Sequence, residues 1–272
     1  DCLKKNPRAR PSASEVVERL MEQIYEGRRH FEQGESPFRG LLAFAERHAD
    51  YFFGRDAEIS ACSERLRQES IMAIVGPSGV GKSSFIQAGV IPRLREGARW
   101  IVLRIRPADD PLRRLASKLV AALKGESGSN PVGSAESAPN PTPVVVKIGE
   151  DSPAPRTRSD AVRELYDILE KTPHMASVYL RELALQRDAK VLLLVDQMEE
   201  LFTLSRDEST QAAFVEAICG AADDPAEPVR VVFTLRDDFL GSWANMGESA
   251  REVLGNVMIL KSPDSETLRE VL

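Results

Sequence analysis

The sequence predicts an α/β fold, a three-layer sandwich in which helices flank a central, mostly parallel sheet. Three observations lead to this prediction. Short apolar runs of strand length alternate with longer segments of helical period, as in βαβ units. The run from Val191 to Val195 is apolar throughout, which is typical of a parallel strand buried on both faces. A glycine-rich turn at residues 76–83 separates one such strand from the helix that follows it.

The expected elements follow one another in a regular order. Apolar runs predict strands at residues 71–75, 100–106, 191–195, 229–235 and 256–260. Apolar side chains at three- and four-residue spacing, such as Leu112, Leu115 and Leu119, indicate the helices. The helices are expected at residues 56–69, 83–95, 110–123 and 209–222, and a further one begins at Ser265. This alternation of strands and helices implies a parallel sheet.

Residues 124–160 interrupt the alternation. They contain 6 Pro, 4 Gly and 6 Ser. Such a segment cannot bury enough apolar surface to offset the entropy lost on ordering. We therefore expect a disordered insertion, with Val144–Val146 as its apolar island. Without this insertion, the chain between Lys82 and Asp196 leaves room for two βα units.

Length and composition exclude several classes of protein. The 272 residues carry 36 Lys+Arg and 42 Asp+Glu, and the net charge of −6 disfavours a duplex nucleic-acid binder. No apolar run approaches the roughly 20 residues that span a bilayer, and no signal peptide opens the chain. The three cysteines, Cys2, Cys62 and Cys219, are too scattered for a disulfide framework or a zinc site. We expect a cytoplasmic protein without nucleic-acid or membrane partners.

The strongest motif lies at residues 76–83 and fits G-x-x-x-x-G-K-[ST] in full. Its glycines let successive backbone N–H groups surround phosphate oxygens, and the next helix aims its positive end at the anion. Lys82 would contact the β- and γ-phosphates of ATP, or the β-phosphate of ADP, and Ser83 would offer a hydroxyl to Mg²⁺. A glycine-rich turn without a ligand is the alternative. The expected nucleotide-binding residues are Gly76, Pro77, Ser78, Gly79, Val80, Gly81, Lys82, Ser83 and Ser84.

An acid at the end of another apolar strand completes such a site. Asp196 follows the run 191–195 and is expected to hold Mg²⁺ through its water shell. Glu199 and Glu200 come shortly after it, and either carboxylate could orient the water that attacks the γ-phosphate. The alternative is that one or both are solvated acids at the start of a helix. We slightly prefer Glu199.

Two further segments are candidates for the site. Arg236 ends the strand 229–235, where it could sense the γ-phosphate; a salt bridge to a neighbouring aspartate is the alternative. Phe53, Gly54 and Arg55 precede the first strand and could border the adenine. For these three residues the alternative is a turn that leads into the helix at Asp56.

Several segments together resemble the bacterial "novel STAND" NTPases, signal transduction ATPases with numerous domains. Beyond the phosphate motif, the Phe-Phe-Gly-Arg and Asp-Gln-x-Glu-Glu-Leu-Phe segments are the specific ones. The resemblance covers about residues 36–272. The matching segments are residues 36–41, 51–55, 76–84, 106–107, 196–202 and 234–239.

This resemblance implies a regulated ATP switch. ADP would hold a closed form, and exchange for ATP would open it and expose surfaces for oligomer assembly. The chain departs from the family's pattern at Gln197, where an acid is usual, and it ends before the winged-helix lid that the family carries. By match, Gly54 and Arg55 would lie on the adenine side, Lys82 and Ser83 would bind phosphate and Mg²⁺, Asp196 would be the Mg²⁺ acid and Arg236 the sensor.

The N-terminus has a resemblance of its own. Residues 2–13 resemble the last subdomain of a Ser/Thr protein kinase, in which the arginine that matches Arg10 pairs with a glutamate of the larger lobe. Ser12 and Glu15 form a capping box for a helix that ends near residue 25, and residues 26–37 read as a linker. Both ends are expected to be cut from a longer protein. Its other parts would be a kinase domain and C-terminal sensor repeats.

Three functions compete at this point. The first is an ATP-hydrolysing signalling switch within a kinase–STAND protein. The second is a regulatory or scaffold module that holds nucleotide as a structural plug with negligible turnover. The third is a nucleic-acid-dependent motor, which the net charge of −6 disfavours. The kinase active site is absent, so we expect no protein phosphorylation by this chain.

Overall fold

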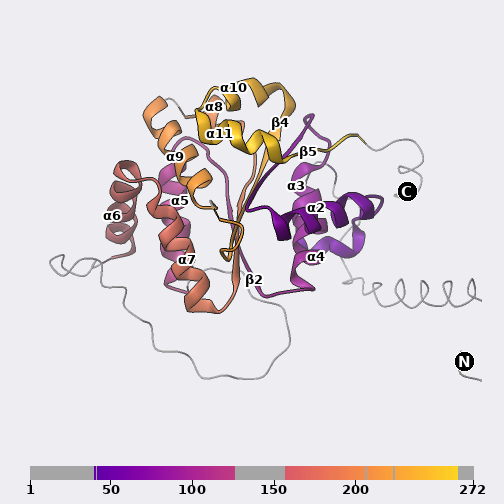
Figure 1. Cartoon of the computed structure of the whole chain (residues 1–272), viewed down its shortest axis with the longest axis horizontal. Coiled ribbons are helices and arrows are strands. Elements are labelled where there is room, and N and C mark those ends of the chain that lie inside the picture. Colours follow the sequence, from indigo (N-terminus) through magenta and orange to yellow (C-terminus); the bar gives the residue numbers. More distant parts are fainter. Residues whose placement is uncertain (1–39, 41, 126–156, 206, 223, 263–272) are drawn as a thin grey trace, which may run out of the picture.

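The computed structural model describes residues 40, 42–125, 157–205, 207–222 and 224–262 (Figure 1). A single sheet of five strands crosses this part of the molecule, in the order β2-β3-β4-β1-β5, and every neighbouring pair is parallel. The predicted α/β fold with a central parallel sheet is thus confirmed. The strands are β1 Ile71–Gly76, β2 Trp100–Ile105, β3 Lys190–Val195, β4 Val229–Arg236 and β5 Val257–Ile259.

Helices flank the sheet on both faces. Figure 1 shows α2, α3 and α4 on one side of the strands, and α5, α6, α7 and α9 on the other. The larger helices are α2 Asp56–Gln68, α5 Pro111–Leu123, α6 Arg158–Lys171, α7 Met175–Arg187 and α9 Glu208–Gly220. The shorter ones are η2 Glu46–Tyr51, α3 Lys82–Ser84, η3 Phe85–Val90, α4 Ile91–Arg95, α8 Glu200–Thr203, η4 Asp237–Phe239, α10 Leu240–Ala244, α11 Glu248–Val253 and η5 Leu254–Asn256.

The alternation of side chains along each strand divides the core into two halves. In β3, Val191, Leu193 and Val195 pack with α5, α7 and α9, whereas Leu192 and Leu194 pack with α2 and α4. Successive strand residues point to opposite faces, so a strand covered on both faces must be apolar at every position. All five of these side chains are fully or almost fully buried.

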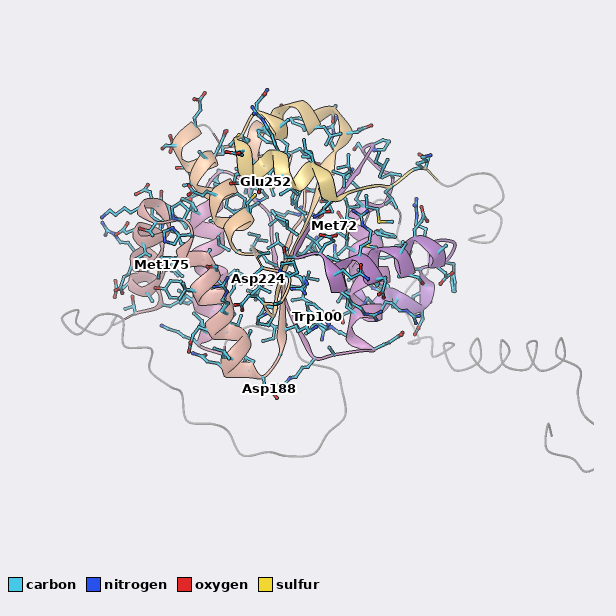
Figure 2. All side chains as sticks on the ribbon, in the orientation of Figure 1. Met72, Trp100, Met175, Asp188, Asp224 and Glu252 are labelled. Atoms are coloured by element: carbon cyan, nitrogen blue, oxygen red, sulfur yellow. The ribbon has the colours of Figure 1, made fainter. Side chains whose placement is uncertain are left out.

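The two halves can be followed by side chain in Figure 2. Met72 and Trp100 lie on the side of α2 and α4, and Met175 lies at the start of α7 on the other side. Within the described residues, no helix has both the length and the apolar character needed to cross a membrane.

The five strands lie where the apolar runs predict them, to within one residue at each end. The expectation of two βα units between Lys82 and Asp196 is wrong. Before β3, which ends at Val195, the described residues of this stretch hold a single strand, β2; β2 and α5 make one βα unit, and α6 and α7 occupy the remaining length.

The expected limits of the insertion are also wrong at both ends. Lys124 and Gly125 complete the end of α5, and α6 begins within the segment assigned to the insertion. Thr157 caps α6, because its hydroxyl accepts from the Asp160 N–H while the Asp160 carboxylate accepts from the Thr157 N–H. Residues 126–156 lie outside the described residues, as do the expected helix at 1–25, the linker and the helix start at Ser265.

Candidate functional site

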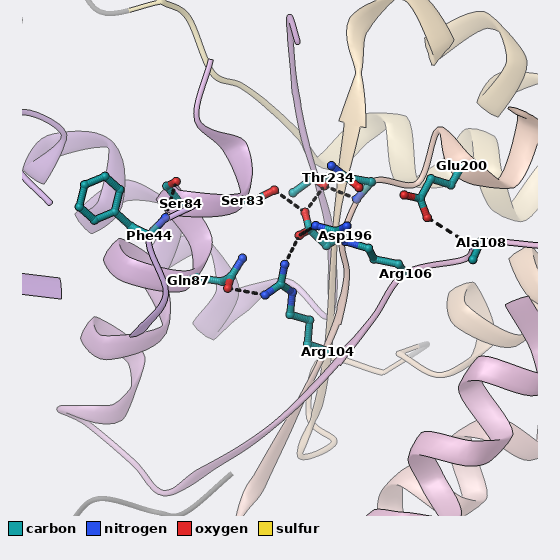
Figure 3. Close-up of polar contacts among 11 residues, drawn as sticks. Phe44, Ser83, Ser84, Gln87, Arg104, Arg106, Ala108, Asp196, Glu200 and Thr234 are labelled. Atoms are coloured by element: carbon teal, nitrogen blue, oxygen red, sulfur yellow. Dashed lines mark hydrogen bonds and ion pairs between the residues drawn. The ribbon is translucent and has the colours of Figure 1, made fainter. Parts of the chain in front are cut away.

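The site lies where the parallel strands end. Because their carboxyl ends meet at one edge of the sheet, β1 leads into the glycine-rich loop, β3 into Asp196 and β4 into Arg236. β4 lies between β3 and β1, so the acid and the loop are separated by the width of one strand. The edge strand β2 adds its own polar end beside β3 (Figure 3).

Glycines shape the loop that follows β1. Gly79 and Gly81 have φ angles of 79° and 93°, in the left-handed region that residues with a Cβ avoid. Glycine is required at position 76 for a different reason: a Cβ there would lie 2.4 Å from the carbonyl oxygen of Leu260. Pro77 and Ser78 are exposed in the same loop, and Val80 is buried beneath it.

Lys82 begins the helix that follows the loop, and its side chain is buried. Its Nζ donates to the carbonyl oxygens of Gly76 and Pro77, at 2.7 and 2.9 Å. Burial lowers the pKa of this ammonium, and the nearby Glu199 carboxylate partly opposes the shift. The charge is therefore held at the mouth of the loop, where a phosphate oxygen could replace either carbonyl.

Asp196 is fully buried and is the centre of a polar network (Figure 3). Its Oδ1 accepts from the hydroxyls of Ser83 and Thr234, at 2.7 and 2.9 Å. Its Oδ2 accepts from Nη2 of Arg104 at 2.7 Å, and Nη2 of Arg106 lies 4.0 Å from the same oxygen. A buried carboxylate requires such partners, because an uncompensated one would be very costly.

These groups fit a magnesium–nucleotide complex. Mg²⁺ prefers oxygen ligands, and the Ser83 hydroxyl and the Asp196 carboxylate are placed together by a hydrogen bond of 2.7 Å. The loop in front of them has the glycine conformations that a phosphate-binding turn needs. Within the described residues, no group of three or more His, Cys, Asp or Glu side chains forms a separate metal cluster.

The two candidate glutamates point in different directions. Glu199 accepts hydrogen bonds from its own backbone N–H and that of Arg236, and it lies close enough to Lys82 for the two charges to interact. Its Oε2 is buried, and no donor among the described residues reaches it. Glu200 instead accepts from the backbone N–H of Ala108 at 3.2 Å, on the loop after β2 (Figure 3).

The carboxyl group of Glu199 has a perturbed acidity. Burial raises its pKa above the ordinary value of 4.5, although the backbone N–H groups and the positive charge of Lys82 lower it in part. A buried, unpaired carboxylate oxygen beside the phosphate loop is the feature expected of a group that orients or deprotonates water.

The remaining predicted residues are held by local contacts. Arg236 forms an ion pair with Asp238, with Nη2 to Oδ2 at 2.6 Å, which was the alternative to a sensor role. Its guanidinium also lies over the ring of Phe239, at 5.5 Å from the centroid. Ser84 accepts from the backbone N–H of Phe44 at 3.0 Å, so its hydroxyl faces the N-terminal segment.

The Phe53–Arg55 turn lies beside the loop. Arg55 is buried, and its Nη2 donates to the carbonyl oxygens of Val80 and Lys261, at 3.2 and 3.0 Å. It therefore connects the phosphate loop to the segment after β5. Gly54 has a φ of 78° and Phe53 has an exposed side chain.

Sequence reasoning missed three side chains of the network: Thr234, Arg104 and Gln87. Thr234 also accepts from the backbone N–H of Gln197 at 2.7 Å, and Gln87 accepts from Nη1 of Arg104 at 2.5 Å. A signal was present for two of them. Thr234 and Arg104 are polar residues inside largely apolar strands, and such positions need a hydrogen-bond partner.

Fold and site together define a P-loop nucleotide-binding protein. The chain belongs to the family described as Novel STAND NTPase 1, whose model matches residues 37–272. It is therefore a nucleotide-binding NTPase module, as the resemblance implied. No curated protein matches the chain.

Solved structures of low sequence identity share the fold. The chain is similar to the ORC2 protein of Aeropyrum pernix in its ADPNP–ADP complexes, with a TM-score of 0.52, 13% identity and coverage of 88% of this chain and 54% of that one. A Walker-type ATPase of Pyrococcus abyssi gives a TM-score of 0.50 and 15% identity, over 87% and 60% of the chains. The Aeropyrum pernix ORC1 protein in complex with DNA gives 0.48 and 16%, over 81% and 48%. This chain thus spans about half the length of these structures.

Proposed function

We propose that this chain is an ATP-binding and ATP-hydrolysing switch module of a signalling protein. The observation that carries the proposal is the meeting of Lys82, Ser83, Asp196 and Glu199 at the carboxyl edge of the sheet. A loop that only turned the chain would need neither a buried lysine nor a buried acid beside it.

In the proposed reaction, each side chain has one task. Ser83 and Asp196 would hold Mg²⁺, which when bound supplies positive charge to the phosphate oxygens. Lys82 exchanges its carbonyl partners for β- and γ-phosphate oxygens. Glu199 accepts a hydrogen bond, and then a proton, from the attacking water. Its position near Lys82 supports this role over Glu200, whose carboxylate already bonds to Ala108.

Arg236 is the proposed sensor of the γ-phosphate. Its ion pair with Asp238 is partly exposed, so it costs little to exchange. The Arg236 backbone N–H bonds to the Glu199 carboxylate. Movement of the side chain toward a phosphate would therefore occur next to the residue that orients water.

The test is binding of fluorescent ATP to the 272-residue chain with Mg²⁺, for the wild type and Lys82→Ala. We expect binding that ADP competes and GTP does not, and a loss of at least tenfold in affinity in the variant because a charged contact to phosphate is removed. Equal binding by the two proteins would contradict the proposal.

The alternative function, a module that holds nucleotide as a structural plug, differs from the switch in its rate of ATP turnover. Multiple turnovers by the wild type, lost in Glu199→Gln, support the switch. Binding with no turnover in the wild type supports the plug. Glu200→Gln is the matched control, because its carboxylate faces Ala108 instead of the loop.

We also propose the setting of the module: a longer chain that carries a Ser/Thr kinase domain before it and sensor repeats after it, with an oligomer formed in the ATP state. The kinase-like residues 1–25 support this setting through their sequence alone. Light scattering with ADP and with a slowly hydrolysed ATP analogue tests the oligomer, which should form only with the analogue.

A further inference from the structure

Arg104 connects the edge strand to the buried acid of the site. It lies on β2, in register with Leu194 of β3, and its guanidinium extends over the strand end toward Asp196. Nη2 donates to Oδ2 of Asp196 at 2.7 Å, and Nη1 donates to Oε1 of Gln87 at 2.5 Å. The side chain is about one third exposed, so it can be reached from solvent.

The two oxygens of Asp196 are used differently. Oδ1 accepts two hydroxyl donors, Ser83 and Thr234, which fill its two lone-pair directions. Oδ2 accepts from the guanidinium of Arg104 alone within hydrogen-bond distance among the described residues. Oδ2 is therefore the oxygen to which a metal-bound water would donate, and the positively charged guanidinium of Arg104 already occupies it.

We propose that Arg104 is a positioning residue that sets the Mg²⁺ dependence of nucleotide binding, because its guanidinium competes with hydrated Mg²⁺ for Oδ2 of Asp196. This inference rests on the proposed function of the site. Arg104 reduces the dependence of nucleotide binding on Mg²⁺ in two ways. With Mg²⁺ present, it competes with the metal at Asp196 and weakens nucleotide binding. Without Mg²⁺, it supplies positive charge near the phosphates and strengthens nucleotide binding.

The second contact of Arg104 holds it in place. Gln87 is buried in the π-helical segment η3, directly after the phosphate loop and α3. Its Nε2 has no acceptor among the described residues, whereas its Oε1 bonds to Arg104. Since a buried unpaired amide nitrogen costs free energy, the bond to Arg104 is the one that orients this amide.

Arg106 provides a matched control. It lies on the same side of the same strand end and carries the same charge, but its Nη2 is 4.0 Å from Oδ2 and its side chain is about half exposed. A half-exposed arginine at this distance, beyond hydrogen-bond reach, contributes little. A general change in charge near the site would affect Arg104 and Arg106 variants alike, whereas competition at Oδ2 would not.

The experiment measures the dissociation constant of fluorescent ADP in excess Mg²⁺ and in EDTA, with the 272-residue chain. The quantity compared is the ratio of the EDTA value to the Mg²⁺ value. In Arg104→Gln we expect this ratio to rise about tenfold, the size expected from a charged hydrogen bond. In Arg106→Gln it should change less than about twofold.

Arg104→Lys keeps the charge but cannot bond to both partners, so its ratio should stay within about threefold of the wild type. A tenfold rise in this variant as well would overturn the proposal. If circular dichroism shows that Arg104→Gln does not fold, Arg104→Met takes its place. That variant also removes the charge at Oδ2 of Asp196 and should raise the ratio about tenfold, and an unchanged ratio overturns the inference.

The outcomes separate this inference from the proposed function. A wild-type chain that binds ADP in neither condition overturns both. A wild type that binds ADP, with the same ratio in Arg104→Gln as in the wild type, overturns the role of Arg104 and leaves the nucleotide site intact. An equal rise in Arg106→Gln also overturns it, because the effect would then be one of net charge.

Discussion

At the scale of single residues, Glu199 combines a functional position with a cost to stability. Burial raises its pKa above 4.5, so the folded protein favours the protonated form more than the unfolded chain does. The stability that this group contributes is present below its unfolded pKa and is lost as the pH rises through its higher folded pKa. At neutral pH the charged carboxylate is therefore a burden on the fold.

Glu199→Gln should thus raise the melting temperature at neutral pH, by about 2 °C, and lower ATP turnover at least about a hundredfold. In the wild type, the acid limb of the turnover profile should lie above the pH at which an ordinary glutamate titrates, because only the ionised form accepts a proton. Differential scanning fluorimetry and a coupled ATPase assay from pH 4.5 to 8 measure both. A variant that is less stable and equally active would contradict the assignment.

Individual contacts were the least predictable part of the site. The sequence identifies the loop, Lys82, Ser83 and Asp196, because each belongs to a motif with fixed spacing. It could not separate Glu199 from Glu200, since their directions depend on the left-handed backbone of Gln197, whose φ is 61°. It could not pair Arg104 with Asp196 either, because that contact requires β2 to lie next to β3.

At the scale of elements, Gly76 determines how closely β1 and β5 can approach beyond their paired residues. The backbone of Leu260 occupies the space of a Gly76 Cβ, at 2.4 Å, and the Leu260 N–H bonds to Val75 at 2.7 Å. Gly76→Ala should lower the free energy of unfolding by roughly 1–3 kcal/mol, because the obstacle is backbone and cannot rotate away. Urea unfolding followed by circular dichroism measures this loss.

Gly241→Ala is the control for this substitution. Gly241 lies in α10 without a positive φ, and a Cβ there would meet nothing within 4 Å. Alanine should be neutral or slightly stabilising at such a helical position. If both variants lose the same free energy, the close approach at Gly76 is not the cause.

Elements were predicted well where the pattern is local. The five strands are continuous apolar runs, and burial on both faces explains why periodicity located each one. The helices α6 and α7 were missed although Ala176, Leu180 and Leu183 recur at helical spacing, because a regular alternation of strands and helices does not include three consecutive helices such as α5, α6 and α7. The π-helical turn η3 interrupts the single helix expected at residues 83–95, and it places Gly89 so close to Ile59 that a Cβ there would lie 2.7 Å from the Ile59 side chain.

At the scale of the whole molecule, the residues of the site belong to several strands of the sheet. The loop extends β1, Asp196 extends β3 and Thr234 belongs to β4, while Arg55 ties the loop to the chain after β5. A ligand held by groups on several strands cannot bind the unfolded chain in the same way. Binding should therefore stabilise the described part of the chain as one unit, and not the loop alone.

The size of this stabilisation follows from mass action. ADP with Mg²⁺ at about 100 times its dissociation constant should stabilise the fold by about 2.7 kcal/mol, which for a domain of this size raises the melting temperature by roughly 5–11 °C. Lys82→Ala should abolish most of the shift at the same concentrations, and GTP should produce little in either protein. Scanning fluorimetry gives the shift, and hydrogen exchange gives its extent. Protection confined to residues 76–84, without slower exchange in β3 and β4, would show that nucleotide orders only the loop and would contradict the coupling described above.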